Sequence, residues 1–330
     1  MEPRIRQLYN PSILASAAER FDIPLDSIRE LDGFENYIYS CTSPRGDSVL
    51  RIGHELHRTP AMTRGEIHWV DTLAKHGVSV PRVFPSRRGA LVEVIPAEDG
   101  SSFSAVLLEK APGRPPRRED WNAGLLRQVG SLLGKMHRIA QAYQPPSPAE
   151  RRPDWHADMA DFARKFLPPG NEGVIQKHEE LMAHLATLPV DPSGYGLIHQ
   201  DVHGGNFFVA DGGITLFDFD DCLYAWFMHD VAMTLFYVLP MDCSAPEDVE
   251  FARRCFGELM DGYARENHLD RAWYVEVPNF LKWREIDLYI AIHRSLDVEN
   301  LDPWTAKFMT NRKYKIESDL PYVALDFASL

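Results

Sequence analysis

The feature that constrains the fold most is a change of hydrophobic pattern near residue 110. Before "KAPGRPPRRED" (residues 110–120), apolar and polar residues form short runs typical of strands. After it, apolar residues recur at intervals of three and four over residues 125–139, which predicts an amphipathic helix. Further helices are expected at residues 230–239, 249–267 and 277–296. The pattern predicts an α+β fold with a small strand-rich lobe and a larger helical lobe.

The strand-rich part can be divided into elements. Residues 36–42 and 48–53 flank the turn sequence "SPRGD" and are expected to form a hairpin. Residues 88–96 and 103–111 are expected to form a second strand pair. One helix, over residues 63–76, is expected among these strands.

Composition limits the class of protein. The 330 residues are 45% apolar, so the chain can bury a sizeable core, and the formal net charge of −13 repels nucleic acid and anionic membranes while attracting cationic ligands. The four cysteines are widely spaced, without a CxxC pair, which favours a reducing compartment. No run has the character of a signal peptide or a membrane span. We therefore expect a cytoplasmic protein whose partners are small molecules.

Residues 196–221, "GLIHQDVHGGNFFVADGGITLFDFDD", concentrate polar side chains between short apolar runs. One interpretation is a zinc site formed by His199, Asp201 and His203, although the two glycines that follow indicate a loop rather than a regular strand. A solvated acidic loop is a second interpretation, but it does not explain why "DFDD" directly follows the apolar "ITLF". Carboxylates at the end of a buried strand need partners or a metal.

Phosphoryl transfer is the third interpretation of this stretch. Asp201 and Asn206 lie on one loop, and Asp218 follows a short hairpin that can fold it back beside that loop. One carboxylate can accept the proton of a substrate hydroxyl while the amide and the second carboxylate hold Mg²⁺ on nucleotide phosphates.

The stretch resembles a known pattern. His199, Asp201 and Asn206 fit the HxDxxxxN motif of the aminoglycoside phosphotransferase and choline kinase superfamily, and "LFDFDD" (residues 216–221) resembles its IDFxD segment. The resemblance implies a protein-kinase-like fold and ATP or GTP as the phosphate donor. It also implies that Asp201 is the catalytic base, that Asn206 and Asp218 bind Mg²⁺, and that His199 is a structural part of the loop.

A kinase-like fold requires a cation for the phosphates and an acidic partner on a nearby helix. Arg51, in "SVLRIG", and Glu66 are the candidates, with arginine in the place of the lysine of protein kinases. Arg51 could also be an ordinary exposed strand residue. Glu66 could instead close a capping box with Thr63, in "TRGE", although the family pattern favours the pair with Arg51.

The remaining nucleotide contacts are less distinct in the sequence. There is no GxGxxG motif, and the candidates for covering the phosphates are Gly33, Phe34, Glu35 and Asn36. Residues 109–113 fit a hinge. There, the backbone of Glu109, Lys110 and Ala111 is expected to bind an adenine edge, and Gly113 to let the chain turn. This division assigns residues 1–108 to a nucleotide-binding lobe and residues 114–330 to a helical lobe with the catalytic loop and the acceptor site.

Roles on the acceptor side stay open at this point. His203 could contact substrate or only support the loop, and one of Asp220 and Asp221 is expected to brace the catalytic loop while the other faces the substrate. Asp230 is expected to anchor this region at a helix start, and His137 to pack near the end of its helix. Acidic and aromatic residues of the helical part suit an amine-bearing acceptor: Asp221, Tyr224, Trp226, Trp283, Glu285, Tyr289 and Trp304.

Several segments together resemble a bacterial subgroup that includes amicoumacin kinase: "GFENYIY", "VLRIGHELHRT", "LEKAPG" and "FDFDDCLYAWFMHD". The resemblance implies a kinase that phosphorylates a hydroxyl group of an aminated natural product or antibiotic. A protein serine/threonine kinase on the same fold, and a catalytically silent binding protein, are the alternatives.

Overall fold

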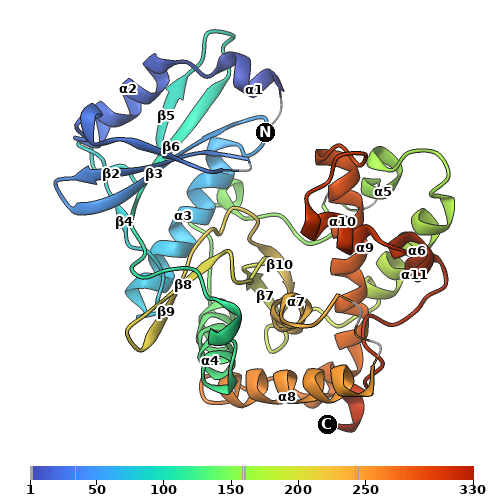
Figure 1. Cartoon of the computed structure of the whole chain (residues 1–330). Coiled ribbons are helices and arrows are strands. Elements are labelled where there is room, and N and C mark those ends of the chain that lie inside the picture. The colour runs from blue at the N-terminus through green and yellow to red at the C-terminus, as the bar shows by residue number, and fades with distance from the viewer. Residues whose placement is uncertain (1–2, 34, 158, 160, 242, 244) are drawn as a thin grey trace. The chain divides into compact units, whose positions relative to one another are not determined.

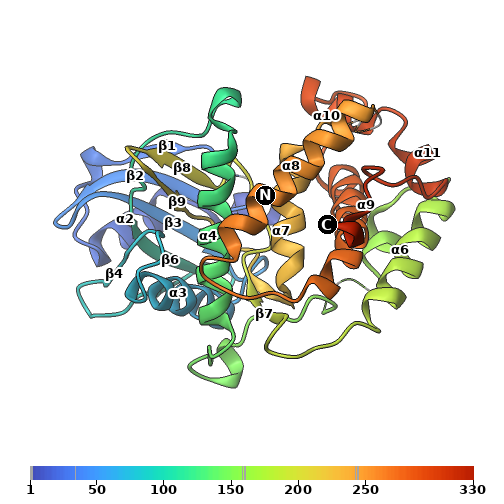
Figure 2. The ribbon, with the colours of Figure 1, turned by 90° about the horizontal axis from the view of Figure 1, so that it is seen from below.

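The computed structural model describes residues 3–33, 35–157, 159, 161–241, 243 and 245–330. The chain forms two units (Figure 1, Figure 2). The first comprises Met1–Pro115, Gln144–Arg152 and Phe207–Asp220, and the second comprises Pro116–Tyr143, Pro153–Asn206 and Asp221–Leu330. Two segments that the sequence-based division placed in the helical lobe, 144–152 and 207–220, therefore belong to the first unit.

The first unit is built on a six-stranded antiparallel sheet. Its strands are β1 (Arg29–Leu31), β2 (Tyr37–Ser43), β3 (Gly46–His54), β4 (Val83–Phe84), β5 (Glu93–Pro96) and β6 (Ser102–Glu109). The order is β1-β2-β3-β6-β4, and β5 pairs with β6. Both predicted strand pairs, β2 with β3 and β5 with β6, are confirmed. A separate hairpin, β8 (Phe207–Ala210) with β9 (Gly213–Leu216), completes the strands of this unit.

Helices cover both faces of this sheet. Leu50 and Ile52 of β3 share a buried cluster with Ile13 and Ala17, residues of α2 (Pro11–Arg20). Side chains alternate along a strand, so Arg51 points to the other face. There it meets α3 (Pro60–Lys75).

The sequence predicted one helix in this region, but α1 (Pro3–Leu8) and α2 precede the sheet. The start of α2 carries a local signal in the sequence. Asn10 Oδ1 accepts the amide hydrogen of Ser12 (3.0 Å), and Pro11 occupies the first helical turn, where no amide hydrogen is needed.

The predicted start of α3 at Thr63 is also wrong. The helix begins at Pro60, and Thr59 Oγ1 caps it by accepting the amide hydrogen of Met62 (3.3 Å). Glu66 therefore lies about two turns beyond the cap, whereas a capping box would need the glutamate at the position of Met62.

The second unit is mostly helical. Its longer helices are α4 (Ala123–Ala140), α6 (Glu172–Leu185), α7 (Phe227–Val238), α8 (Pro246–Tyr263) and α9 (Val277–Ser295). Shorter elements are η2 (Arg118–Asp120), α5 (Phe162–Phe166), η4 (Arg271–Glu276), α10 (Pro303–Met309), α11 (Arg312–Glu317) and η5 (Phe327–Ser329). The helices predicted from periodicity are confirmed as α4, α7, α8 and α9, with ends shifted by a few residues. The α+β prediction is confirmed by the two units together.

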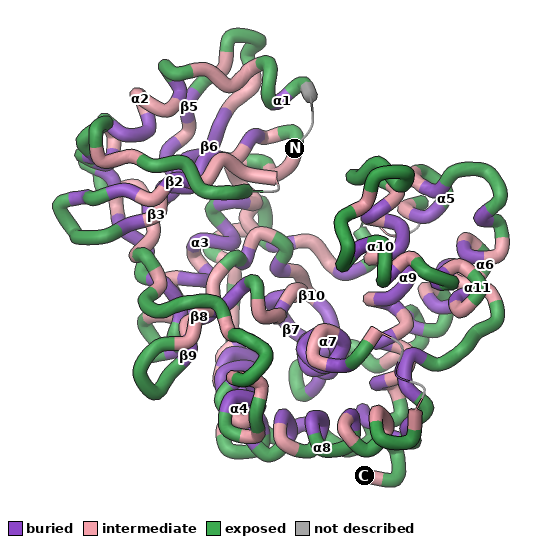
Figure 3. Tube along the Cα trace, viewed as in Figure 1, coloured by how far each residue is buried: buried purple, intermediate pink, exposed green. Residues whose placement is uncertain are grey.

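Helix α7 forms the centre of this unit. Its residues from Phe227 to Phe236 are all buried (Figure 3). Two short antiparallel strands, β7 (Tyr195–Ile198) and β10 (Leu223–Trp226), lie beside it, and β10 leads directly into α7. None of the helices within the described ranges combines the length and the apolar character needed to cross a bilayer.

Candidate active site

The loop of residues 199–206, which follows β7, is anchored by one carboxylate. Asp230 Oδ2 accepts the amide hydrogen of His199 (2.9 Å), and Oδ1 accepts that of Gln200 (2.7 Å). His137 Nε2 lies 3.1 Å from Asp230 Oδ2. Burial alone would raise the pKa of Asp230, but the hydrogen bond from His137 brings it below its usual value. Asp230 thus stays ionised in the core and holds two consecutive amides in place.

His137 is packed as predicted, although its partner is Asp230 rather than the end of its own helix. Its ring stacks on Phe227 with centroids 4.5 Å apart, and its Nδ1 lies 3.1 Å from Tyr263 Oη. Asp230 lies in the first turn of α7, which begins at Phe227, and not at the cap position. The buried His137–Asp230 pair therefore joins α4 to α7 beneath the loop.

Gln200, directly before Asp201, has a backbone φ of 79°. This left-handed region is unfavourable for a residue with a side chain and costs about 1 kcal/mol. The hydrogen bond from the Gln200 amide to Asp230 helps to hold this conformation. The strained residue thus lies directly before Asp201, at the point where Asp230 anchors the loop.

The Asp201 carboxylate is surrounded by three donors of the second unit. Asn206 Nδ2 donates to Oδ2 (3.1 Å), and His203 Nε2 lies 3.2 Å from the same oxygen. Arg284 Nη2 donates to Oδ1 (3.1 Å). Burial alone would raise the pKa of Asp201, but Arg284 and then His203 hold it well below its usual value. Asp201 therefore stays ionised near neutral pH. It is available to accept a proton from a substrate hydroxyl that binds beside it.

The tautomer of His203 follows from its neighbours. Its Nδ1 accepts the amide hydrogen of Gly205 (2.9 Å), so the ring proton lies on Nε2, which donates to Asp201. The ring packs against Tyr237, with centroids 4.6 Å apart. His203 thus supports the loop and also contacts the carboxylate expected to act as the base.

Asn206 can serve as a ligand for a hard cation. Both hydrogens of its Nδ2 are used, by Asp201 O (2.9 Å) and Asp201 Oδ2 (3.1 Å). Because these atoms only accept hydrogen bonds, the amide cannot be flipped, and its oxygen is directed away from them. An amide oxygen held in this way is a group that Mg²⁺ accepts.

Asp218, the second predicted Mg²⁺ ligand, belongs to the first unit. Its backbone φ is 66°, and its side chain is exposed while Phe219, its neighbour, is buried. Asp218 is also close enough to Arg51 to help raise the pKa of that guanidinium, after Glu66 and Asp220, and an accessible carboxylate at this place suits a metal ligand.

Arg51, also in the first unit, forms the predicted pair with Glu66. Arg51 Nη2 donates to Glu66 Oε2 (2.6 Å), and Nη1 lies 3.9 Å from Asp220 Oδ1. Arg51 is buried, so it is not the ordinary exposed strand residue that was the alternative. Burial would lower the pKa of Arg51, but Glu66 and Asp220 raise it, and the guanidinium stays charged.

Asp220 has partners that the sequence did not indicate. His57 Nε2 lies 2.7 Å from Asp220 Oδ2, and its Nδ1 lies 2.5 Å from Glu35 Oε2. Arg58 Nε donates to the Asp220 carbonyl (3.1 Å). Burial would lower the pKa of His57, but its hydrogen bonds to Asp220 and Glu35 raise it to about 9. A protonated His57 therefore joins the loop expected to cover the phosphates to Asp220. No spacing rule links His57 to Glu35 or Asp220. The sequence gave only one hint of this contact, which is that His57 lies a few residues after Arg51.

The loop predicted to cover the phosphates contains Gly33, and the surrounding backbone leaves no room for a side chain there. A Cβ atom at Gly33 would lie 2.2 Å from the Asn36 carbonyl oxygen, so no other residue fits. The Asn36 side chain lies against Gly53 of β3, where a Cβ would lie 2.4 Å from Asn36 Oδ1. Phe34, the fourth candidate of this loop, lies outside the described residues.

The segment expected to be the hinge follows β6. Glu109 pairs with Arg82 (2.7 Å), and the amide of Lys110 donates to Asp47 O (3.1 Å). Within the described part of the chain, no hydrogen bond engages the amide of Ala111. Gly113 has a φ of 95°, and a Cβ there would lie 2.1 Å from the Val209 carbonyl oxygen. Ala111 thus offers a free donor just before a turn that requires glycine.

The other predicted residues lie at different depths in the second unit. His199 is fully buried, and its Nδ1 accepts the amide hydrogen of Asp201 (3.2 Å). Trp226 is also fully buried and donates from Nε1 to Pro189 O (2.8 Å). Tyr224 is partly buried, and Asp221 is exposed. Trp226 therefore belongs to the core that supports the site.

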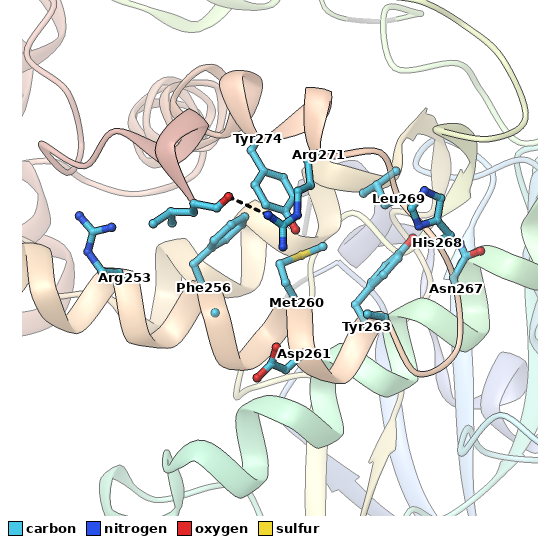
Figure 4. A pocket seen from close by; sticks show the side chains of 13 residues that line it. Arg253, Phe256, Met260, Asp261, Tyr263, Asn267, His268, Leu269, Arg271 and Tyr274 are labelled. Carbon is cyan, nitrogen blue, oxygen red and sulfur yellow. Dashed lines mark hydrogen bonds between the residues drawn. The ribbon is translucent and has the colours of Figure 1, made fainter.

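A separate hollow of about 400 Å³ lies in the second unit, beside α8 and η4 (Figure 4). It includes Arg271, whose Nη1 donates to Leu330 O (3.3 Å), and Tyr263, the partner of His137. Within the described ranges, none of the predicted site residues lines it. The hollow is thus distinct from the surroundings of Asp201.

Arg284 and Tyr237 are the residues near Asp201 that sequence reasoning missed. Arg284 donates to both Asp201 and Tyr237, and its guanidinium carbon lies 5.2 Å from the centre of the Tyr237 ring. Both residues lie on helices, α9 and α7, and carry no motif. A contact between positions 201 and 284 has no local pattern that could reveal it.

Comparisons with known proteins agree with this geometry. The model of the phosphotransferase enzyme family matches residues 27–269. The amicoumacin kinase of Bacillus subtilis (strain 168) is 35% identical over 327 residues, which is 98% of this chain and 96% of that protein. A homoserine kinase of Cupriavidus necator is 26% identical over 201 residues, 58% of each protein.

Solved structures show the same fold. The amicoumacin kinase hAmiN, solved in complex with AMP-PNP, Ca²⁺ and Ami, has a TM-score of 0.92 and 32% identity, and the match covers 100% of this chain and 99% of that one. A microcompartment-associated aminopropanol kinase has a TM-score of 0.72 and 20% identity, over 94% of this chain and 96% of that one. Spectinomycin phosphotransferase APH(9)-Ia, with a TM-score of 0.58, shares the fold at 13% identity, over 96% of this chain and 97% of that one.

Proposed function

The chain belongs to the phosphotransferase enzyme family, and we propose that it transfers the γ-phosphate of ATP to a hydroxyl group of amicoumacin or a related amine-bearing antibiotic. The predicted resemblance to aminoglycoside phosphotransferases and choline kinases is confirmed, as is the kinase-like fold. The enzyme is a small-molecule kinase that uses an alcohol group as acceptor.

The first unit supports the nucleotide part of this proposal. Arg51 supplies a permanent cation for phosphate oxygens, and Glu66 fixes its position through the 2.6 Å ion pair. The loop with Gly33 and Asn36 covers the phosphates. The free amide of Ala111 and the neighbouring backbone of Glu109 and Lys110 bind the adenine edge.

The second unit supports the transfer chemistry. Asp201 accepts the proton of the acceptor hydroxyl, which makes the hydroxyl oxygen a better nucleophile for the γ-phosphorus. Asn206 and Asp218 would hold Mg²⁺, which neutralises phosphate charge when it is bound. His199 and Asp230 hold the loop. The observation that carries the chemistry is the ionised Asp201 carboxylate held beside the Asn206 amide.

The class of acceptor rests on similarity and on charge. The match to an amicoumacin kinase extends over 98% of the chain, whereas the match to a homoserine kinase covers 58%. The net charge of −13 attracts a cationic amine and disfavours nucleic acid as a partner. Asp221 is exposed and Tyr224 partly so, and with His203 they are the residues that we assign to the acceptor side.

The experiment has two arms. Mg²⁺ with ATP, and separately with GTP, should raise the melting temperature of the protein, and ATP is expected to give the larger shift. A coupled assay of ADP formation is then run with amicoumacin, amino alcohols, homoserine, a sugar and a generic protein substrate. Amicoumacin is expected to be consumed fastest, and mass spectrometry should detect the addition of one phosphoryl group.

Each arm has an outcome that contradicts the proposal. No melting-temperature shift with either nucleotide would remove the kinase assignment. Nucleotide binding with turnover of homoserine or protein, and none of amicoumacin, would retain the kinase and reject the acceptor.

A further inference from the structure

The hydrogen bonds of Asp201 distinguish its two carboxylate oxygens. Oδ2 accepts from Asn206 Nδ2 and from His203 Nε2, which fills both acceptor positions that a carboxylate oxygen offers. Among the residues that the structure describes, only Arg284 Nη2 donates to Oδ1 (3.1 Å). One acceptor position therefore remains, on Oδ1 and directly beside the Arg284 guanidinium.

Arg284 is itself held in place. Its Nη2 donates to Tyr237 Oη as well as to Asp201, and the guanidinium lies over the Tyr237 ring at 5.2 Å from its centre. The Arg284 side chain is only 18% exposed. Tyr237 also packs against His203, the donor on the other side of the carboxylate. The aromatic ring thus fixes the donors of both carboxylate oxygens.

We propose that Arg284 is a positioning residue of the transfer reaction, which holds the Asp201 carboxylate with Oδ1 toward the acceptor hydroxyl, and that Tyr237 holds Arg284. This inference rests on the proposed function. In the reaction, the acceptor O–H bond breaks and its proton moves to Oδ1. The acceptor oxygen bonds to the γ-phosphorus, and the bond from phosphorus to the bridging oxygen breaks, its electron pair leaving on ADP.

The role of Arg284 is geometric because a carboxylate can rotate about its last side-chain bond. The two donors on Oδ2 restrain this rotation from one side, and the guanidinium on Oδ1 restrains the same rigid carboxylate from the other. A small misplacement of a reacting group lowers the rate strongly while ground-state binding is little changed. Nucleotide binding, which uses groups of the first unit and the metal ligands, should therefore not depend on Arg284.

The test uses Arg284→Met, Arg284→Lys, Tyr237→Phe and the double variant Arg284→Met with Tyr237→Phe. With amicoumacin as the acceptor, we expect kcat to fall about 10²-fold in Arg284→Met. Arg284→Lys keeps the charge but not the planar fork, so we expect a fall of about 10-fold, and a similar fall in Tyr237→Phe. The double variant should be no slower than Arg284→Met, because Tyr237 acts through Arg284. The nucleotide-induced rise in melting temperature should persist in all variants.

The control is Arg294→Met, which removes an exposed arginine from the same helix and should leave kcat unchanged. Parent-like kcat in both Arg284 variants would overturn the inference and leave the proposed function intact. A fall in kcat accompanied by loss of the nucleotide shift would overturn it by indicating general damage. Strictly additive effects in the double variant would overturn it by showing that Tyr237 does not act through Arg284. If the parent protein transfers phosphate neither to amicoumacin nor, slowly, to water, both the proposed function and this inference are overturned.

Discussion

The clusters around Arg51 and around Asp201 are opposite in sign. In the first unit a guanidinium lies at the centre, with Glu66 at 2.6 Å and Asp220 at 3.9 Å. In the second unit a carboxylate lies at the centre and receives hydrogen bonds from neutral donors and one cation. Each centre stays charged because its partners compensate burial. The sign at the centre indicates the ligand: a central cation suits a phosphate, and a central carboxylate suits a hydroxyl proton.

The clusters also differ in how they are held. Arg51 lies on a regular strand and Glu66 on a regular helix, so secondary structure places both groups. Asp201 lies on a loop with a strained residue before it, and the buried Asp230 places that loop. Loops can present a group at an angle that strands and helices do not offer, but they need an internal anchor of this kind.

Removal of the central carboxylate, Asp201, should lower kcat more than any other change proposed here. In Asp201→Asn, an amide replaces the carboxylate at nearly the same size, and we expect kcat to fall about 10³-fold because no group accepts the hydroxyl proton. Nucleotide binding, followed by thermal shift, should remain. Asp211→Asn, an exposed position in the β8–β9 turn, is the matched control. Turnover equal to the parent would reject Asp201 as the base.

Replacing Asp230, the carboxylate that anchors the loop, tests whether the cluster around Asp201 depends on that anchor. Asp230→Asn leaves the buried His137 and two amides with incomplete partners, so we expect the free energy of unfolding of the second unit to fall by about 3 kcal/mol. Urea denaturation followed by circular dichroism measures this change. The exposed Asp261→Asn on α8 should unfold like the parent. Equal stability of the two variants would show that the loop holds itself.

Removal of the central cation should have a smaller effect on the reaction, through nucleotide binding, and it also leaves the buried Glu66 without its ion pair. Arg51→Met is expected to weaken ATP binding about 30-fold, because a hydrogen-bonded cation contributes about 2 kcal/mol at a phosphate. Arg51→Lys should retain most of the affinity. Isothermal titration calorimetry with Mg²⁺ and ATP gives both values, and Arg45→Met, at an exposed turn, serves as the control. Unchanged affinity in Arg51→Met would separate this cluster from the phosphates.

The last expected effect is a pH-dependent change in melting temperature, and it involves the first cluster only. The pKa of His57 is raised to about 9 in the folded protein, above its unfolded value of about 6.5. Its stabilising contribution is therefore complete below pH 6.5 and is lost as the pH rises through 9. We expect His57→Gln to lower the melting temperature at pH 6 and to equal the parent at pH 9.5. A difference that persists at pH 9.5 would show that the His57 charge is not responsible.

Prediction from sequence succeeded where the determinants are local. The β2–β3 hairpin follows from alternation and a turn sequence, and α4 follows from periodicity. Spacing placed Asp201 and Asn206 on one loop, where they share a hydrogen bond, and the family pattern predicted the pair of Arg51 with Glu66. The catalytic and metal-binding roles of these residues stay predictions. In contrast, α2 was missed because its apolar residues are few, although Asn10 and Pro11 marked its start.

The unpredicted contacts join positions far apart in the chain. His57 meets Asp220, and Arg284 meets Asp201, without any spacing that relates them. Such pairs depend on how helices and loops pack in three dimensions. Periodicity and motifs describe single elements or familiar spacings, so they revealed Glu66 and Asn206 but not Arg284 and His57, which come from distant parts of the chain.

The discontinuity of the first unit has a consequence for the synthesis of the protein. Its last segment, Phe207–Asp220, supplies Asp220 and the β8–β9 hairpin, whose Leu216 amide bonds to Ser79 O (3.0 Å). A ribosome must therefore translate about two thirds of the chain before this unit can be completed. Until then, Arg51 and His57 lack one of their carboxylates, so the nascent N-terminal part should be a good substrate for chaperones and proteases.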